Sequence, residues 1–294
     1  MSESPVTAPV CYRHPSKETY IRCTRCERSI CPDCMNEASV GHQCPECVAQ
    51  GRRTQRSART AFGGSAAGKA GTATKTLIGI NVVAMVFSII SGGSGAVAGG
   101  GMGGLLGGST PLTSWGGVWT YYIAGNNEFY RLFTAMFLHY GVIHLLLNMY
   151  ALWILGRQLE GALGPLRFTG LYLLAGLGGN VAAYVFTGID GGNTVGASTA
   201  VFGLMAAMLV LLKRLNLSVA PILPVIVINV IFTFTISGIS VPGHLGGMFT
   251  GFAAAIALAY APKDRRGLVQ GIGLGAILLV LVVISIARTL SLTT

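Results

Sequence analysis

The chain has 294 residues, of which 52% are hydrophobic and only 10% are charged, and its formal net charge is +10. Soluble globular proteins carry about 25% charged residues, so this composition excludes an ordinary soluble domain. Much of the chain must instead face lipid or the interior of a helix bundle, and the 42 glycines suit close helix packing in a membrane.

All seven cysteines lie between Cys11 and Cys47, where four pairs have C-x-x-C or C-x-x-H spacing. Such pairs suit tetrahedral zinc. A cross-braced order predicts one site of Cys11, His14, Cys31 and Cys34 and another of Cys23, Cys26, Cys44 and Cys47, with His42 as a ninth candidate. The alternative is a disulfide framework, which would leave one cysteine over and would follow no secretory signal peptide.

Closed four-ligand sites leave no coordination position for water, so both zinc ions are expected to be structural. We expect them to stabilise a small head over residues 1–50, in a reducing compartment. Residues 51–75 contain six Arg or Lys residues and no acid, which predicts a flexible basic linker attracted to anionic headgroups. Nucleic-acid binding is not expected, because no aromatic residues alternate with the basic ones. The sequence identifies no partner of the head.

Seven hydrophobic runs follow the linker, and about 20 residues suffice to cross a bilayer. They cover residues 76–92, 132–155, 166–186, 195–212, 217–236, 243–261 and 268–288, with a glycine-rich stretch at 91–108. We therefore expect an all-α polytopic membrane protein.

The basic residues of the short loops predict its orientation, because cytoplasmic loops are rich in Lys and Arg. The linker places the N-terminus in the cytoplasm, and an odd number of spans places the C-terminus outside. The loop cations on the linker side agree, and they are Arg157, Arg167, Lys213, Arg214, Lys263, Arg265 and Arg266. Arg131 and Arg288 are exceptions near the outer ends of their spans.

No Asp or Glu falls within a predicted span, which argues against a transporter coupled to protons or cations. The polar residues within the spans are instead His139, His144, Asn148, Ser198 and His244. In the predicted orientation all five lie in the outer half of the membrane, although residues far apart in sequence supply them. This common depth is typical of a site.

Ser198 and His244 are the candidate catalytic pair. A serine hydroxyl needs an adjacent base to become a nucleophile, and imidazole is the usual one. Gly243, Gly247 and Gly251 form a small-xxx-small seam that would bring His244 close to a neighbouring helix. Because the spans offer no carboxylate to orient the imidazole, we expect a dyad, in which Phe202 holds the ring.

An oxyanion formed in such a reaction needs preorganised donors. The Ser198 backbone N–H, the Asn148 amide and the His144 ring N–H are candidates. No catalytic cofactor is expected.

These residues fall into three motifs: Gly196-Ala197-Ser198, His139-x4-His144-x3-Asn148 and Gly243-His244-x2-Gly247-x3-Gly251. Together they resemble the rhomboid family of intramembrane serine proteases over roughly residues 76–261. The resemblance implies a six-helix catalytic core, preceded by the zinc head and followed by an additional membrane helix at 262–294. The head itself resembles the B-box-like module of some bacterial rhomboids.

The resemblance also assigns roles to individual residues. It implies Ser198 as nucleophile, His244 as base and His144 with Asn148 as oxyanion donors, and it gives Phe202 the place that stacks on the imidazole. His139 takes a mainly structural position. Tyr130-Arg131 looks like the Trp-Arg pair of the first loop, and Glu160 like an acidic residue after the second span.

Two positions depart from the family pattern, which commonly has Gly at 199 and Trp at 130, where this chain has Thr199 and Tyr130.

The expected function is cleavage of transmembrane protein substrates in the lipid bilayer of the cell membrane. The alternative is a non-catalytic rhomboid-like chaperone or retention factor.

Overall fold

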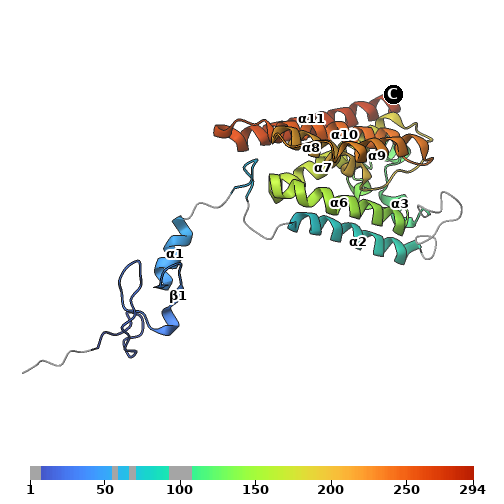
Figure 1. The fold of residues 1–294 in the computed structure, drawn as a ribbon. Coiled ribbons are helices and arrows are strands. Elements are labelled where there is room, and N and C mark those ends of the chain that lie inside the picture. Colours follow the sequence, from blue (N-terminus) through green and yellow to red (C-terminus); the bar gives the residue numbers. More distant parts are fainter. Residues whose placement is uncertain (1–7, 55–58, 66–70, 93–107) are drawn as a thin grey trace, which may run out of the picture. The chain divides into compact units, whose positions relative to one another are not determined.

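The computed structural model describes residues 8–54, 59–65, 71–92 and 108–294. It contains two compact units, Met1–Ser57 and Ala58–Thr294, which we treat separately (Figure 1). Most of the glycine-rich stretch at 91–108 lies outside the described residues, as do Arg56 and Lys69 of the expected linker.

The first unit is built around its cysteines. It contains the 3-10 helix η1 (Pro32–Cys34), the antiparallel pair β1 (Asn36–Glu37) and β2 (His42–Gln43), and helix α1 (Pro45–Thr54). Six of the seven cysteines are buried, and among the described residues Ile30 is the only fully buried aliphatic side chain that packs with them. An apolar core this small supplies little folding free energy by itself.

The second unit is helical, and its long helices lie side by side (Figure 1). Its elements are α2 (Thr72–Gly92), α3 (Pro111–Gly116), α4 (Thr120–Asn126), α5 (Arg131–Thr134), η4 (Ala135–Phe137), α6 (Val142–Leu163), α7 (Pro165–Phe186), α8 (Ser198–Arg214), α9 (Leu223–Thr235), α10 (Val241–Ala259), η5 (Lys263–Arg265) and α11 (Arg266–Thr293).

Five helical segments of the described residues are long and apolar enough to cross a membrane, which makes this a multi-pass membrane protein. They are Thr72–Gly92, Val142–Leu163, Pro165–Phe186, Val241–Ala259 and Lys263–Thr293. The other two expected spans correspond to the shorter helices α8 and α9, of 17 and 13 residues. The structure thus contains a helix for each of the seven hydrophobic runs.

The second span differs most from its predicted bounds of 132–155. Helix α6 begins only at Val142, because Gly141 has φ +110, and it continues to Leu163 before Gly164 with φ +82. His139 therefore precedes the helix, and Glu160 lies inside it. Glu160 is buried and accepts hydrogen bonds from Ala73 N, Thr74 N and Thr74 Oγ1 at the start of α2. The expectation that no acid falls within a span was wrong at this position, where the carboxylate caps a helix.

The core of the bundle is the contact between α7, α8 and α10. Helix α8 buries twelve of its 17 residues. Glycines allow its backbone to touch that of α10. A Cβ on Gly247 would lie 2.0 Å from the Thr199 carbonyl oxygen, and one on Gly251 would lie 2.3 Å from Gly203 Cα. The predicted seam therefore packs against the helix that carries Ser198.

A short hairpin precedes α2 and packs against the bundle. Its strands bridge at Arg59 and Ser65, and Phe62 between them is 3% exposed and belongs to the core. Phe62 N–H donates to Ala162 O at 3.3 Å, and Gln270 Nε2 donates to Phe62 O at 3.1 Å. Part of the expected flexible linker is thus held by α6 and α11.

Candidate functional site

Ser198 is the first residue of α8, at the end of the connection from α7. Two hydrogen bonds hold the segment just before it: Gly196 N–H donates to Ala135 O at 3.0 Å, and Ala197 N–H donates to His139 Nε2 at 3.4 Å. The Ser198 N–H lies in the first helical turn, where backbone N–H groups have no acceptor within the helix. This N–H is therefore available to a ligand beside the Ser198 hydroxyl.

His244 lies in the first turn of α10, 46 residues further along the chain, and its Nε2 is 2.8 Å from Ser198 Oγ. Its ring stacks on Phe202 with centroids 4.1 Å apart and an interplanar angle of 21°. The structure thus brings the serine, the histidine and the aromatic ring together as the sequence suggested.

The second ring nitrogen of His244 has a partner that sequence reasoning missed. His244 Nδ1 is 2.8 Å from the hydroxyl of Thr233, which in turn donates to Asn229 O at 2.8 Å. A hydroxyl that donates its only proton to a carbonyl must accept from the ring. Nδ1 then carries the ring proton, and Nε2 is free to accept from Ser198.

The other histidine of the pocket, His144, has the opposite arrangement. Tyr140 N–H donates to His144 Nδ1 at 3.4 Å, so the ring proton lies on Nε2. A Cβ on Gly196 would lie 3.0 Å from this Nε2 and 3.3 Å from Ser198 Oγ. Because Gly196 has φ +140 and no side chain, the space between the imidazole and the hydroxyl remains open.

Asn148 lies one turn after His144 on α6. Its Nδ2 donates to His144 O at 2.9 Å, which leaves the second amide proton free to bind another acceptor. His139 is 1% exposed, and its Nδ1 has no hydrogen-bond partner among the described residues. Its Nε2 accepts from Ala197 N–H, so this side chain contacts the backbone just before Ser198.

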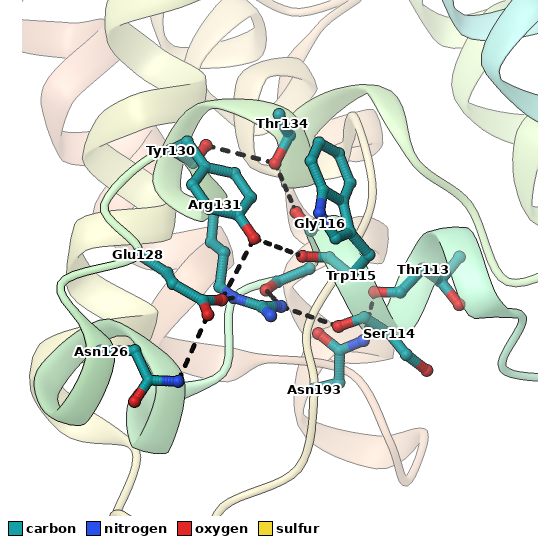
Figure 2. A network of polar contacts seen from close by, with 11 residues as sticks. Thr113, Ser114, Trp115, Gly116, Asn126, Glu128, Tyr130, Arg131, Thr134 and Asn193 are labelled. Carbon is teal, nitrogen blue, oxygen red and sulfur yellow. Dashed lines mark hydrogen bonds and ion pairs between the residues drawn. The ribbon is translucent and has the colours of Figure 1, made fainter.

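The first loop, residues 108–141, is held by a network centred on Arg131 (Figure 2). The Arg131 guanidinium donates to Glu128 Oε2 at 2.6 Å and to the carbonyls of Ser114 and Gly117 at 2.7 and 3.2 Å. Tyr130 stacks on Trp115 with centroids 5.0 Å apart. The hydrogen bond from Arg131 lowers the pKa of Glu128, which is thereby kept ionised.

Asn193 joins this loop to the segment that carries Ser198. Its side-chain Nδ2 donates to Thr113 O at 2.6 Å, and its backbone carbonyl accepts from the Tyr140 hydroxyl at 2.6 Å. Val118 and Thr194 form a backbone bridge beside it. The first loop and the connection before α8 are therefore joined by hydrogen bonds.

The first unit contains two groups of candidate metal ligands. Cys11, His14, Cys31 and Cys34 form one and Cys23, Cys26, Cys44 and Cys47 the other, and within each group the ligand atoms lie within 4.8 Å of one another. These are the two groups that the cross-braced order predicts, and His42 belongs to neither. Both donor sets suit a tetrahedral thiophilic metal, so the unit can hold two metal ions.

Backbone hydrogen bonds prepare part of these thiols for a metal. Desolvation raises the pKa of Cys23, but hydrogen bonds from Cys44, Arg25 and Cys26 backbone groups outweigh it and bring the pKa to about 6. For Cys34, desolvation dominates and raises the pKa to about 11. A bound cation would have to deprotonate the second kind of thiol.

Comparisons with known proteins agree with these motifs. The Rhomboid domain family matches residues 126–261, which include His139, His144, Asn148, Ser198 and His244. The chain is 37% identical to "Rhomboid protease GluP" of Bacillus subtilis over 150 residues, covering 49% of this chain and 29% of that protein. It is 35% identical to "RHOMBOID-like protein 6, mitochondrial" of Arabidopsis thaliana, covering 48% of each. The chain thus spans less than half the length of these two relatives.

A shorter relative is covered more completely. The chain is 34% identical to "Putative rhomboid protease YdcA" of Bacillus subtilis over 146 residues, which make up 72% of that protein. The match, the helical bundle and the three motifs lead to one assignment: this all-α, multi-pass membrane chain belongs to the rhomboid family.

Proposed function

We propose that the chain is an intramembrane serine endopeptidase that hydrolyses peptide bonds of transmembrane protein substrates, with Ser198 as nucleophile and His244 as general base. The observation that carries this proposal is the 2.8 Å contact between His244 Nε2 and Ser198 Oγ across two helices. The names of two bacterial relatives, "Rhomboid protease GluP" and "Putative rhomboid protease YdcA", support it.

The reaction would proceed in two halves. Ser198 Oγ attacks the carbonyl carbon of the scissile bond while its proton moves to His244 Nε2, and the carbonyl oxygen becomes an oxyanion. Collapse of this intermediate breaks the C–N bond, and the imidazolium gives its proton to the leaving amine. Water then attacks the acyl-enzyme with His244 again as base and releases the carboxylic acid.

The oxyanion would lie in the space beside Gly196. His144 Nε2 and Ser198 Oγ border this space. The donors would be the His144 Nε2–H, the Ser198 backbone N–H and the free proton of the Asn148 amide. Preorganised donors of this kind typically contribute a factor of about 10²–10³ each to the rate. Removing Asn148 by substitution with Ala is therefore expected to lower kcat more than it raises KM.

The test is cleavage of a transmembrane reporter in liposomes by wild type, Ser198→Ala and His244→Ala. We expect a cut only with wild type. Ser198→Cys is a useful further variant, because a cysteine thiolate can itself act as nucleophile and restore weak activity. If Ser198 had only a structural role, no such rescue would be expected. If wild type fails to cut reporters that a known rhomboid cuts, the protease assignment is wrong.

In that outcome the alternative function would lead: a rhomboid-like chaperone or retention factor that binds membrane segments without cutting them. It predicts that wild type and Ser198→Ala retain a bound transmembrane segment equally well and release it intact.

We propose zinc as the metal of both cysteine groups, in a structural role, because each closed set of four ligands leaves no position for water. We also propose a head over residues 1–50, a linker at 51–75 of which the hairpin at 59–65 packs against the bundle, a catalytic core at 76–261 and an added membrane helix at 262–294. The N-terminus would be cytoplasmic and the C-terminus outside, which places Ser198 near the outer surface.

A further inference from the structure

Three arginines from separate segments meet at the end of the bundle opposite Ser198. Arg59 belongs to the hairpin at 59–65, Arg167 to the first turn of α7, and Arg266 to the start of α11. Since α7 has 22 residues at about 1.5 Å each, this end lies roughly 33 Å along that helix from the Ser198 end. We call these residues the arginine cluster.

Hydrogen bonds fix the cluster in place. Arg167 Nε donates to Gln270 Oε1 at 2.6 Å, and Gln270 Nε2 reaches Phe62 O in the hairpin at 3.1 Å. Arg266 Nη1 donates to Ala61 O at 3.2 Å, and a Cβ on Gly63 would lie 2.8 Å from Arg266 Cδ. These bonds hold the hairpin that carries Arg59 against the helices that carry the other two arginines.

The cluster has no anionic partner in the described part of the chain. The three ion pairs formed there are Lys17–Asp33, Arg28–Glu46 and Arg131–Glu128. The charges of Arg59 and Arg266 act repulsively on Arg167. The nearby buried acid, Glu160, is occupied by the start of α2. Like charges held together repel one another, and a bound anion would relieve this repulsion.

We propose that the arginine cluster is a binding site for the phosphate of an anionic membrane lipid. Arginine matches phosphate oxygens with a planar set of donors, and basic pockets between membrane helices suit lipid headgroups. The surroundings favour a lipid over a free anion, because exposed apolar side chains lie beside the cluster on both helices: Leu166 is 83% exposed, and Leu268 and Ile272 are each 62% exposed. An acyl chain can cover them while the arginines hold the headgroup.

The test uses the full-length protein in a neutral detergent. The thermal midpoint and the lipid retained in native mass spectrometry are measured with phosphatidylglycerol, with phosphatidylcholine and with inorganic phosphate. Phosphatidylglycerol should raise the midpoint and remain bound, whereas the other two should do neither. Arg59→Gln and Arg167→Gln should each weaken retention about fivefold, the equivalent of one cationic contact near a surface.

Lys213→Gln is the matched control, since it removes one exposed charge from the same end of the bundle outside the cluster. Arg59→Lys keeps the charge and separates loss of binding from loss of folding. The proposal is overturned if retention of phosphatidylglycerol is the same in the arginine variants and in Lys213→Gln. Equal stabilisation by inorganic phosphate, with the same dependence on arginine, would instead identify a free-anion site.

A second inference rests on a different contact and deepens the proposed protease function, on which it depends. Thr233 is the only buried residue of the 13 in α9, and its Oγ1 lies 2.8 Å from His244 Nδ1. The hydrogen bond from Thr233 Oγ1 to Asn229 O turns the threonine oxygen toward the ring as an acceptor. We infer that Thr233 is a positioning residue, which keeps the His244 proton on Nδ1 so that Nε2 can act as base.

Thr233→Val removes the acceptor at nearly constant volume. We expect kcat for a transmembrane reporter to fall about tenfold with KM unchanged, which corresponds to the loss of one hydrogen bond to the ring. Thr233→Ser should restore the rate. Thr235→Val is the control, because Thr235 is exposed on the same helix and bonds only to its own backbone turn.

Reaction of Ser198 with a fluorophosphonate probe distinguishes failure of the proposed protease function from failure of the positioning role of Thr233. If wild type neither reacts nor cleaves, the proposed function itself is wrong. If wild type does both and Thr233→Val matches it in kcat, only the positioning role is wrong. A change in KM alone would also contradict the inference.

Discussion

Two buried threonines flank the Ser198–His244 pair, and their hydroxyl groups are in opposite situations. Thr233 Oγ1 has a ring nitrogen and a carbonyl as partners. Thr199 is 2% exposed, and its Oγ1 has no partner among the described residues. A Cβ on Gly179 would lie 2.6 Å from Thr199 Cβ, so this side chain fills space that glycine leaves open. Thr199 therefore contributes packing, while its buried hydroxyl forms no hydrogen bond with the described residues.

Thr199→Val should consequently be neutral or stabilising, because it removes an unpaired buried hydroxyl and keeps the shape. Thr199→Ala should destabilise by about 1 kcal/mol through the lost methyl group. Thermal unfolding in detergent measures both. Thr233→Val provides the contrast, since the same change there breaks two hydrogen bonds and should lower the midpoint. Equal shifts at the two positions would contradict this distinction.

At this scale the sequence predicted the residues that belong to motifs. Ser198, His244 and Phe202 could be placed by helical spacing and by the glycine seam, and the structure brings them together. Thr233 could not be found in this way, because α9 carries no motif. A weaker signal could have indicated it: Asn229 and Thr233 are polar residues spaced i,i+4 in a mostly apolar stretch.

At the level of elements, the contact between α8 and α10 determines how close Ser198 and His244 lie to each other. Gly247→Ala would place a methyl group 2.0 Å from the Thr199 carbonyl oxygen, so the two helices must separate. We expect a loss of about 1–3 kcal/mol in stability and loss of reporter cleavage. The control is Gly271→Ala on α11, where a Cβ meets nothing within 4 Å. Retained cleavage in Gly247→Ala would show that the seam does not set the pair.

The first loop should make stability depend on pH through Glu128. Its hydrogen bond to Arg131 holds the pKa of Glu128 below the ordinary value, so the carboxylate stabilises the fold at pH above the unfolded pKa of about 4.3. This stabilisation is lost as pH falls through the folded pKa. The midpoint difference between wild type and Glu128→Gln should be constant above about pH 5 and shrink below it. A difference independent of pH would exclude this ion pair as its source.

Element bounds were harder to predict than site residues. The run at 132–155 is uniformly apolar, and nothing in its composition reveals that Gly141 adopts φ +110 and delays α6 to Val142. Similarly, α9 begins only at Leu223, after the turn that contains Pro221 and with Pro224 in its first turn. Hydrophobicity sets which segments enter the membrane, whereas backbone conformation at a few residues sets where each helix starts.

For the whole molecule, the head offers a direct test of metal content. We expect two zinc ions per chain, one for each group of four ligands. Cys11→Ser should lower the content to one, and His42→Ala should leave it at two. Chelation should expose the head to protease without changing the midpoint of the helical unit, since the two units are separately compact. A content of two in Cys11→Ser would contradict the proposed ligand sets.

The division into a cysteine-rich head and a membrane bundle was visible in composition alone, but the hairpin at 59–65 was not. The composition of this segment, rich in Arg, Gly, Ala and Ser, predicts flexibility. Its single aromatic residue, Phe62, forms no periodic pattern that would indicate burial. Its burial arises from partners on α6 and α11, about 100 and 200 residues further along. Tertiary contacts of this kind leave no local signature.

The seam between α8 and α10 also bears on when Ser198 and His244, the proposed catalytic groups, become aligned. The two helices meet through carbonyl oxygens and Cα atoms, which have no rotamers to choose among. Conformational entropy for bringing Ser198 and His244 together is therefore lost when the bundle folds. In the proposed reaction, a transmembrane substrate would meet groups already within hydrogen-bond distance, so its binding free energy could be used to unwind its own helix.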